Sequence, residues 1–111
     1  MKFHIPIQLP SLANLSTTRR AMIRLKMDQK AATKICLRDA RTQPLPPMPL
    51  LVTITRVGPR RLDDDNLDAA CKYVRDQIAA HVGVDDGSDQ YTWQYKQRIG
   101  KYGVDVEITT R

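Results

Sequence analysis

The fold is decided by residues 50–83, which read LLVTITRVGPRRLDDDNLDAACKYVRDQIAAHVG. Residues 50–57 are rich in β-branched side chains and alternate in character, which predicts a buried strand that a glycine–proline pair then ends. From about residue 66 to 82, apolar residues recur at the i, i+3, i+4 and i+7 spacing of a helix that buries one face, and a glycine stops it. An acidic run, residues 63–66, lies between the strand and the helix.

The N-terminal half of the chain is expected to add a strand and a long helix. Residues 2–9 alternate, and Pro6, which has no N–H to give to a neighbouring strand, favours an edge position. The helix is expected over residues 17–40, with Ser16 as its N-cap. Its buried stripe is predicted to consist of Leu25, Ala32, Ile35 and Cys36. The prolines of residues 42–49 then require an extended connector.

The C-terminal part is expected to form two more strands. Residues 91–97 and 104–108 both alternate, and the glycine-containing turn between them predicts a terminal hairpin. The first of these strands carries three aromatic residues on one face, Tyr91, Trp93 and Tyr95. They could pack in the core or in a dimer interface, or stack on unpaired bases. The predicted order is β-α-β-α-β-β, a single α/β domain over residues 1–111 with a mixed sheet and two helices.

The composition suits one small globular domain. With 111 residues, of which 41% are hydrophobic, the chain buries a limited core, and a homodimer would add buried surface. No stretch approaches the roughly 18 consecutive apolar residues of a membrane span, and the N-terminus does not read as a signal peptide. Cys36 and Cys71 lack the spacing of a zinc site or a disulfide framework. These features predict a cytoplasmic protein with reduced thiols and no membrane partner.

Basic and acidic residues are separated along the chain. The formal net charge is +6, but residues 1–62 hold 12 basic and 2 acidic residues, whereas residues 63–111 hold 6 basic and 10 acidic residues. The first part therefore carries +10 and the second part −4. An anionic partner suits the first part, and bound cations suit the second. Nucleic acid together with a divalent metal ion satisfies both.

The acidic run Asp63-Asp64-Asp65-Asn66 begins the second predicted helix, where carboxylates ordinarily cap a helix and complement its dipole. Three adjacent carboxylates exceed what capping requires, and a bound cation would relieve their mutual repulsion. In an extended segment, Asp63 and Asp65 would share one face while Asp64 points away. The run is therefore either a helix cap alone or part of a metal site.

A second acidic pair, Asp85-Asp86, follows the helix and could be an ordinary loop. The helix is about 25 Å long, so this pair reaches the first run only if the chain folds back along the sheet. Ligand sets made only of carboxylate oxygens favour Mg²⁺ or Mn²⁺ over zinc.

At these residues the chain resembles the RusA family of Holliday-junction resolvases, small dimeric endonucleases often encoded by phages and prophages. The family signature is D-x-D-N, a helix that carries a lysine, and then a D-D pair. It appears here as Asp63-Asp64-Asp65-Asn66, the following helix and Asp85-Asp86. The N-terminal strand, the long helix and the closing strands also fit, so the resemblance covers nearly the whole chain, although its specific part spans only residues 61–86.

The resemblance implies a RusA-like fold and a Mg²⁺-dependent endonuclease that resolves four-way DNA junctions in recombination and repair. Paired phosphodiester hydrolysis at the two sites of a homodimer would leave 5′-phosphate and 3′-hydroxyl ends. Asp63, Asp65 and Asp86 would be the catalytic metal ligands, with Asn66 and Asp85 in support. The protein would act in a bacterial cell and could be encoded by a phage or prophage.

One position departs from the family pattern. The functional lysine of the family usually lies three residues after the asparagine, where this chain has Ala69. Lys72 projects near the same face about one turn later, and it is either the catalytic equivalent or a partner of Asp68 or Asp76 in an ordinary ion pair. Three alternatives therefore stay open: a nuclease for flaps or forks, a catalytically silent DNA-binding protein with the same fold, and a structural metal site in an unrelated basic protein.

Basic residues offer a surface for phosphate groups. The long helix carries a basic ridge of Arg20, Arg24, Lys26, Lys30, Lys34 and Arg38. Its lysines and last arginine recur every four residues in one slanted row, which is either a solvated helix face or a track for a DNA backbone. Arg60 and Arg61 directly precede the acidic run and could hold phosphates beside it. The predicted partner is branched DNA, preferably a four-way junction.

Overall fold

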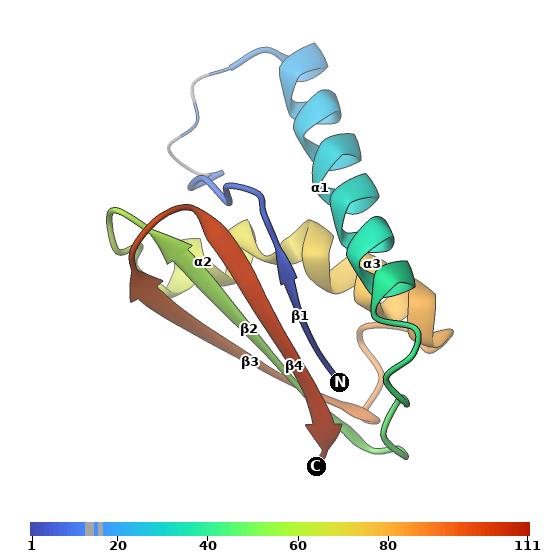
Figure 1. The fold of residues 1–111 in the computed structure, drawn as a ribbon. Coiled ribbons are helices and arrows are strands. Elements are labelled where there is room, and N and C mark those ends of the chain that lie inside the picture. The colour runs from blue at the N-terminus through green and yellow to red at the C-terminus, as the bar shows by residue number, and fades with distance from the viewer. Residues whose placement is uncertain (13–14, 16) are drawn as a thin grey trace.

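The structure is a computed structural model that describes residues 1–12, 15 and 17–111. Its strands form one mixed sheet in the order β1-β4-β2-β3 (Figure 1). Their bounds are β1 (Lys2–Ile5), β2 (Leu50–Gly58), β3 (Tyr91–Ile99) and β4 (Gly103–Thr110). β4 pairs antiparallel with β1 and β2, whereas β2 and β3 run parallel. The predicted mixed sheet is confirmed, and β1 occupies an edge as expected, but it ends at Ile5 and is shorter than the strand predicted over residues 2–9.

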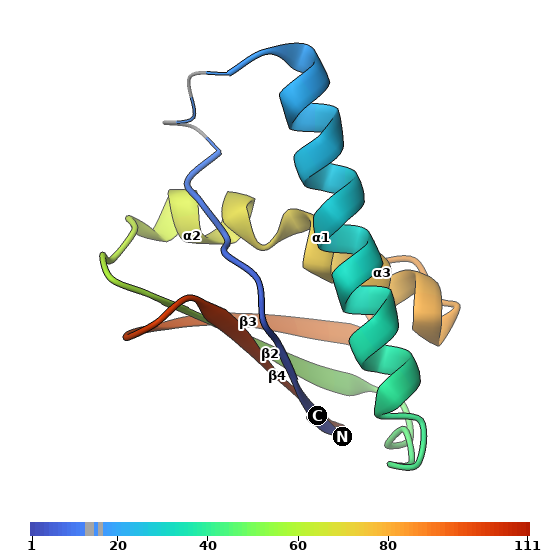
Figure 2. The same ribbon diagram turned by 45° about the horizontal axis from the view of Figure 1, so that its top comes forward.

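The helices of the described chain all lie on one side of this sheet, as Figure 2 shows. Their bounds are α1 (Arg19–Asp39), α2 (Asp64–Ala70) and α3 (Lys72–Val82). Val52 and Ile54 of β2 are fully buried in one core cluster with Leu37 of α1 and Val74 of α3. The single α/β domain therefore has two layers with the core between them. None of the described helices is both long enough and apolar enough to cross a membrane.

Helix α1 falls inside the predicted range, but its cap differs from the prediction. Ser16 lies outside the described residues. The N-cap is Thr18, whose Oγ1 accepts a hydrogen bond from the N–H of Ala21 at 3.1 Å. A threonine in this position satisfies one of the N–H groups that the first turn of a helix leaves without a partner.

The buried stripe of α1 also differs from the predicted one. Its fully buried residues are Gln29, Thr33 and Leu37. Leu25, Ala32 and Cys36 are only half-buried, and Ile35 is 49% exposed. The Thr33 hydroxyl donates to the carbonyl of Gln29 at 2.8 Å, so this polar side chain can face the core at little cost. Hydrophobicity alone does not predict such a stripe.

The single helix predicted over residues 66–82 is two helices, which corrects the expected count of two helices to three. α2 ends and α3 begins around Cys71, whose N–H is shared between the carbonyls of Leu67 and Asp68 at 3.2 Å each. Neither glycine nor proline marks this break in the sequence. Ala70 and Cys71 are both fully buried although they are adjacent, and the local change of direction lets both face the core.

The last two strands do not form the predicted hairpin. β4 lies between β1 and β2, so β2 separates it from β3. The crossover from β2 through α2 and α3 places β3 parallel to β2, with Leu50 opposite Tyr91. The turn after β3 passes the end of β2, where the N–H of Gly100 donates to the carbonyl of Gly58 at 3.0 Å. β4 then pairs antiparallel with the other edge of β2, and its apolar residues Val104, Val106 and Ile108 are buried in the core.

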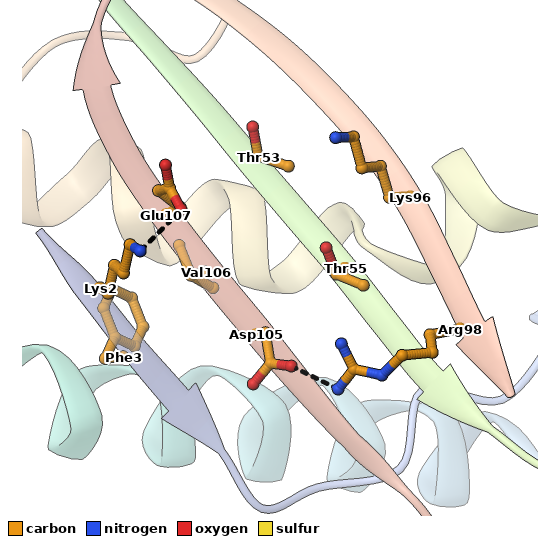
Figure 3. Close-up of a pocket in the computed structure, with 9 residues that line it drawn as sticks. All are labelled: Lys2, Phe3, Thr53, Thr55, Lys96, Arg98, Asp105, Val106 and Glu107. Carbon is orange, nitrogen blue, oxygen red and sulfur yellow. Dashed lines mark hydrogen bonds and ion pairs between the residues drawn. The ribbon is translucent and has the colours of Figure 1, made fainter. Parts of the chain in front are cut away.

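The side of the sheet that faces away from the helices is polar. A hollow of about 430 Å³ lies on this side. Figure 3 shows ion pairs across it, one between the neighbouring strands β1 and β4 and one that joins β3 to β4 across β2. Lys2 lies 3.5 Å from Glu107, and Arg98 donates to Asp105 at 2.8 Å. The imidazole Nδ1 of His4 lies 2.6 Å from the other carboxylate oxygen of Asp105. Several charges on this face are thus paired within the chain, whereas Lys96 also lines the hollow and is outside the ion pairs of the described residues.

We expect Asp105→Asn to lower the free energy of unfolding at pH 7 by about 0.5–1 kcal/mol, the usual range for exposed pairs. The hydrogen bonds from His4 and Arg98 hold the pKa of Asp105 below its ordinary value of 3.8, against partial burial. Its contribution is therefore complete above that ordinary value and is lost as the pH falls through the lower folded pKa. Denaturant unfolding between about pH 7 and pH 2 should show the difference shrinking in acid. Asp89→Asn, which removes an exposed carboxylate, should follow the wild-type pH profile, and a constant difference for Asp105→Asn would contradict the prediction.

Candidate metal and nucleic-acid site

The segment that leads from β2 into the acidic run is held by two side chains of the sheet. Arg56 donates from Nε to the carbonyl of Leu9 at 2.7 Å and from Nη1 to the carbonyl of Arg60 at 2.8 Å. Gln97 of β3 accepts from the N–H of Leu62 at 2.9 Å and donates to its carbonyl at 2.8 Å. The backbone is therefore fixed on both sides of Arg61, immediately before the acidic run.

The acidic run itself begins α2. Asp63 is the N-cap residue and is extended, with φ −63° and ψ 156°, but its side chain makes no capping hydrogen bond. Asp64 and Asp65 already belong to the first helical turn. The expectation that Asp63 and Asp65 share one face of an extended segment is therefore wrong, because only Asp63 is extended. All three side chains are exposed near the positive end of the helix dipole.

Arg75 links the second acidic pair to α2, because it contacts one aspartate of each. The Nη1 atom of Arg75 lies 3.3 Å from Oδ1 of Asp68 on α2, and it donates to the Tyr95 hydroxyl at 3.0 Å. Its Nε lies 3.2 Å from Oδ2 of Asp86, a distance typical of an ion pair although the angle is poor for a hydrogen bond. One guanidinium thus joins α2 to the loop before β3. Asp68 lies three residues after Asp65, about one helical turn away.

The surroundings of Arg75 favour its charged form. Burial alone would lower the pKa of Arg75, but the hydrogen bond to Tyr95 and the charges of Asp68 and Asp86 outweigh burial and raise it. Burial raises the pKa of Tyr95, although Arg75 partly opposes the shift. Arg75 therefore remains a cation and Tyr95 remains a neutral phenol across the physiological range.

The loop that carries Asp86 is held by the aromatic residues of β3. Trp93 donates from Nε1 to the carbonyl of Asp86 at 2.9 Å, and the hydroxyl of Tyr91 donates to the carbonyl of Val84 at 2.9 Å. Their two rings lie 4.8 Å apart between centroids. The side chain of Asp85 accepts from the N–H two residues later at 3.0 Å, which shapes the turn. Tyr91 and Trp93 thus pack inside the chain and hold this loop.

The donor chemistry suits a hard divalent cation, but the ligands are not gathered in this arrangement. Asp63 and Asp65 present carboxylate oxygens, the kind of ligand that Mg²⁺ prefers. Asp86 instead faces Arg75, whose positive charge would compete with a metal ion for the same carboxylate. Within residues 1–12, 15 and 17–111, no three Asp, Glu, His or Cys side chains form a group that could hold a metal ion.

Lys72, the candidate replacement for the functional lysine of the RusA family, lies outside this cluster. Lys72 is exposed at the start of α3, and the ion pairs of the described residues do not include it. Of the two alternatives for Lys72, the ion pair with Asp68 or Asp76 is not formed among the described residues, and Asp68 pairs with Arg75 instead. Arg75 is therefore the cation that forms ion pairs with carboxylates from both α2 and the loop before β3.

Replacing Arg75 by methionine is expected to lower the free energy of unfolding by about 1 kcal/mol, because Asp68 and Asp86 lose their shared counter-charge while both stay partly solvated. Lys72→Met is the matched control, since it removes one positive charge from the same helical turn without removing an ion pair. Its effect should stay within about 0.5 kcal/mol. Urea unfolding of both variants at pH 7 measures the difference, and equal losses would show that the Arg75 pairs add no stability.

The basic ridge of α1 is divided between two surroundings. Lys26 places its ammonium 5.8 Å from the centre of the Tyr73 ring. Lys30 is half-buried and lines a hollow of about 350 Å³ together with Asp76, Asp85 and Asp86. The remaining members, Arg20, Arg24, Lys34 and Arg38, are exposed. Lys26 is exposed as well, but it lies beside Tyr73 of α3, and Lys30 lies beside the second acidic pair.

The chain was compared with protein-family models, with curated proteins and with solved structures. None of them matches it. Its function is therefore argued from its own residues and their geometry.

Three residues that organise the candidate site were missed by the sequence argument: Arg56, Arg75 and Gln97. Arg56 shares the strand face of Val52 and Ile54, so an arginine at a core-facing position was a visible signal. Gln97 likewise shares the face of Tyr91, Trp93 and Tyr95. Arg75 carries no such signal, because its partners come from three separate segments of the chain.

Proposed function

We propose that this chain is a Mg²⁺-dependent endonuclease for branched DNA, similar to the RusA family resolvases that cut four-way junctions. The observation that carries the proposal is the contact of Arg75 with both Asp68 and Asp86, since it brings the second acidic pair back to the helix that begins with the D-x-D-N motif. The exposed arginines beside this helix supply the positive charge that a DNA backbone needs.

In this proposal Asp63, Asp65 and Asp86 hold Mg²⁺, or Mn²⁺ in its place, and Asn66 and Asp85 support them. A bound Mg²⁺ would activate water and withdraw charge from the phosphate. Arg60 and Arg61, fixed between Arg56 and Gln97, would hold phosphates on either side of the scissile one. Lys72 or Arg75 would stabilise negative charge that develops on the phosphoryl oxygens.

The proposal also includes a homodimer that acts in the bacterial cytoplasm on host or phage DNA. A two-fold dimer presents two equivalent sites, and a four-way junction has arms related by matching symmetry. Paired nicks at these sites would resolve the junction into two duplexes.

The test is a cleavage assay with a labelled four-way junction, a flap, a fork and a linear duplex built from the same arms, each with Mg²⁺ and with EDTA. We expect symmetric nicks in the junction with Mg²⁺ only, and little cleavage of the duplex. Equal cleavage of flaps or forks would favour a broader branched-DNA nuclease. Junction binding without cleavage in either Mg²⁺ or Mn²⁺ would exclude the enzyme.

A DNA-binding protein without catalytic activity is the second candidate. Two observations favour it: Ala69 occupies the position of the family lysine, and Asp86 is already paired with Arg75. Such a protein would hold branched DNA through the same basic residues and would not depend on a metal ion. Junction affinity that is equal in Mg²⁺ and EDTA, with no product, is its expected signature.

A further inference from the structure

A hollow of about 510 Å³ borders the segment that leads into the acidic run, and of its lining side chains the proposed mechanism uses only Arg60. Its lining includes Gln8, Ser11, Arg56, Arg60, Leu62 and Tyr102. Leu62 immediately precedes Asp63, so the hollow opens at the start of the candidate metal site. Its lining contains no carboxylate, whereas guanidinium, hydroxyl and amide groups are all present. The polar lining is therefore rich in hydrogen-bond donors.

Arg56 gives this hollow a buried positive charge. Its exposed fraction is 4%, and the ion pairs of the described residues do not include it. Its Nε and Nη1 donate to the carbonyls of Leu9 and Arg60, which leaves Nη2 outside both bonds. Carbonyl dipoles compensate a buried charge only in part, and a buried guanidinium without a carboxylate is costly. An anion bound in the hollow would supply the remaining counter-charge for the guanidinium of Arg56.

A second donor in the lining lacks a partner as well. The hydroxyl oxygen of Ser11 is buried and has no hydrogen-bond partner among the described residues. Buried hydroxyl groups without a partner are uncommon and usually mark a site for a water molecule, an ion or a ligand. Ser11 and Arg56 come from segments far apart in the sequence, yet both line this hollow.

We propose that this hollow binds a phosphate group of a nucleic-acid strand, held by Arg56, Arg60 and Ser11. Phosphate fits because its oxygens accept several charge-assisted hydrogen bonds at once, and guanidinium groups match it in shape. The volume lies in the range of pockets that take a small ligand, so a phosphate can enter with its attached sugar. The identity of the strand as DNA rests on the proposed function, whereas the anion site itself does not.

The test uses the full chain in EDTA, so that it is independent of metal-dependent cleavage. The Nε–H signal of Arg56 in ¹H–¹⁵N spectra is followed during titration with inorganic phosphate, a mononucleotide and a short single-stranded oligonucleotide. Arg60→Gln and Ser11→Ala are the test variants, because both alter the lining without removing the buried Arg56. Arg41→Gln is the charge-matched control, since Arg41 is exposed and is not part of the lining.

We expect saturable shifts of the Arg56 signal and about tenfold weaker binding in Arg60→Gln and Ser11→Ala, with Arg41→Gln unchanged. Saturation by phosphate or by the mononucleotide would show that a free anion is enough for binding in the hollow. Saturation by the oligonucleotide alone would show that binding requires a nucleic-acid strand. Either result supports the site. Absence of Arg56 shifts with every probe, or equal loss in Arg60→Gln and Arg41→Gln, would overturn it. An active nuclease with neither signature would leave the proposed function intact and remove only this site.

Discussion

Junction cleavage by Asp65→Asn is expected to be slower than wild-type cleavage by a factor of at least about 100, because a proposed metal ligand is lost while the side-chain shape is kept. Asp65 lies in the first turn of α2 and is exposed, so the substitution should not unfold the chain. Junction affinity in EDTA should stay within about threefold of wild type, since removing one acidic charge weakens no phosphate contact. The measurement is single-turnover cleavage with Mg²⁺ at saturating protein.

Asp64→Asn is the matched control for this experiment. It removes the same charge from the same helical turn, and its side chain projects about 100° away from that of Asp65. Its cleavage rate should stay within about threefold of wild type, because Asp64 is not among the proposed ligands. Equal losses in the two variants would mean that the net charge of the helix start, and not a ligand at Asp65, governs cleavage.

Arg56→Met is expected to lower the free energy of unfolding by about 3 kcal/mol, the largest stability effect of any single polar substitution considered for this chain. Methionine fills much of the same volume but donates no hydrogen bond, so the carbonyls of Leu9 and Arg60 lose their partners. The N-terminal segment around Leu9 and the segment that leads into the acidic run would both become less ordered. Urea unfolding at pH 7 gives the free energy, and amide hydrogen exchange around residues 9 and 60–62 gives the local effect.

Arg61→Met serves as the control for this stability measurement. Arg61 is exposed and is absent from the hydrogen bonds that fix its neighbours, so its replacement should change the free energy of unfolding by less than about 0.5 kcal/mol. Desolvation of a buried charge opposes the hydrogen bonds of Arg56, and an apolar replacement can in principle recover that cost. A neutral or stabilising Arg56→Met would therefore show that desolvation outweighs the two carbonyl bonds.

Several elements could be predicted because their signals are local. The alternation in residues 50–57 predicts β2, and the apolar period after the acidic run predicts helix from α2 into α3. Gly83, in the left-handed region with φ 86°, ends α3 where the sequence indicates. The position of the D-x-D-N motif at the start of a helix follows from the same local pattern.

Other features depend on contacts between residues far apart in the sequence, and local sequence patterns predict them wrongly. The break at Cys71 carries no glycine or proline, and the alternating strands β3 and β4 predict a hairpin that β2 interrupts. The stripe of α1 includes two polar residues: Thr33 bonds its own helix, whereas the side-chain amide of Gln29 is buried without a partner among the described residues. In each case, packing against another element outweighs local preference.

By itself, the sequence determined which segments are strands and helices, how charge divides along the chain, and that two acidic segments flank one helical region. Local periodicity and turn residues are enough for that, since each acts within a few positions. The tertiary structure alone decided that Arg75 contacts both Asp86 and Asp68, and that the buried Arg56 holds the segment before the acidic run. Those arrangements depend on strand order and on the path of the loop before β3, which the packing of the whole core selects.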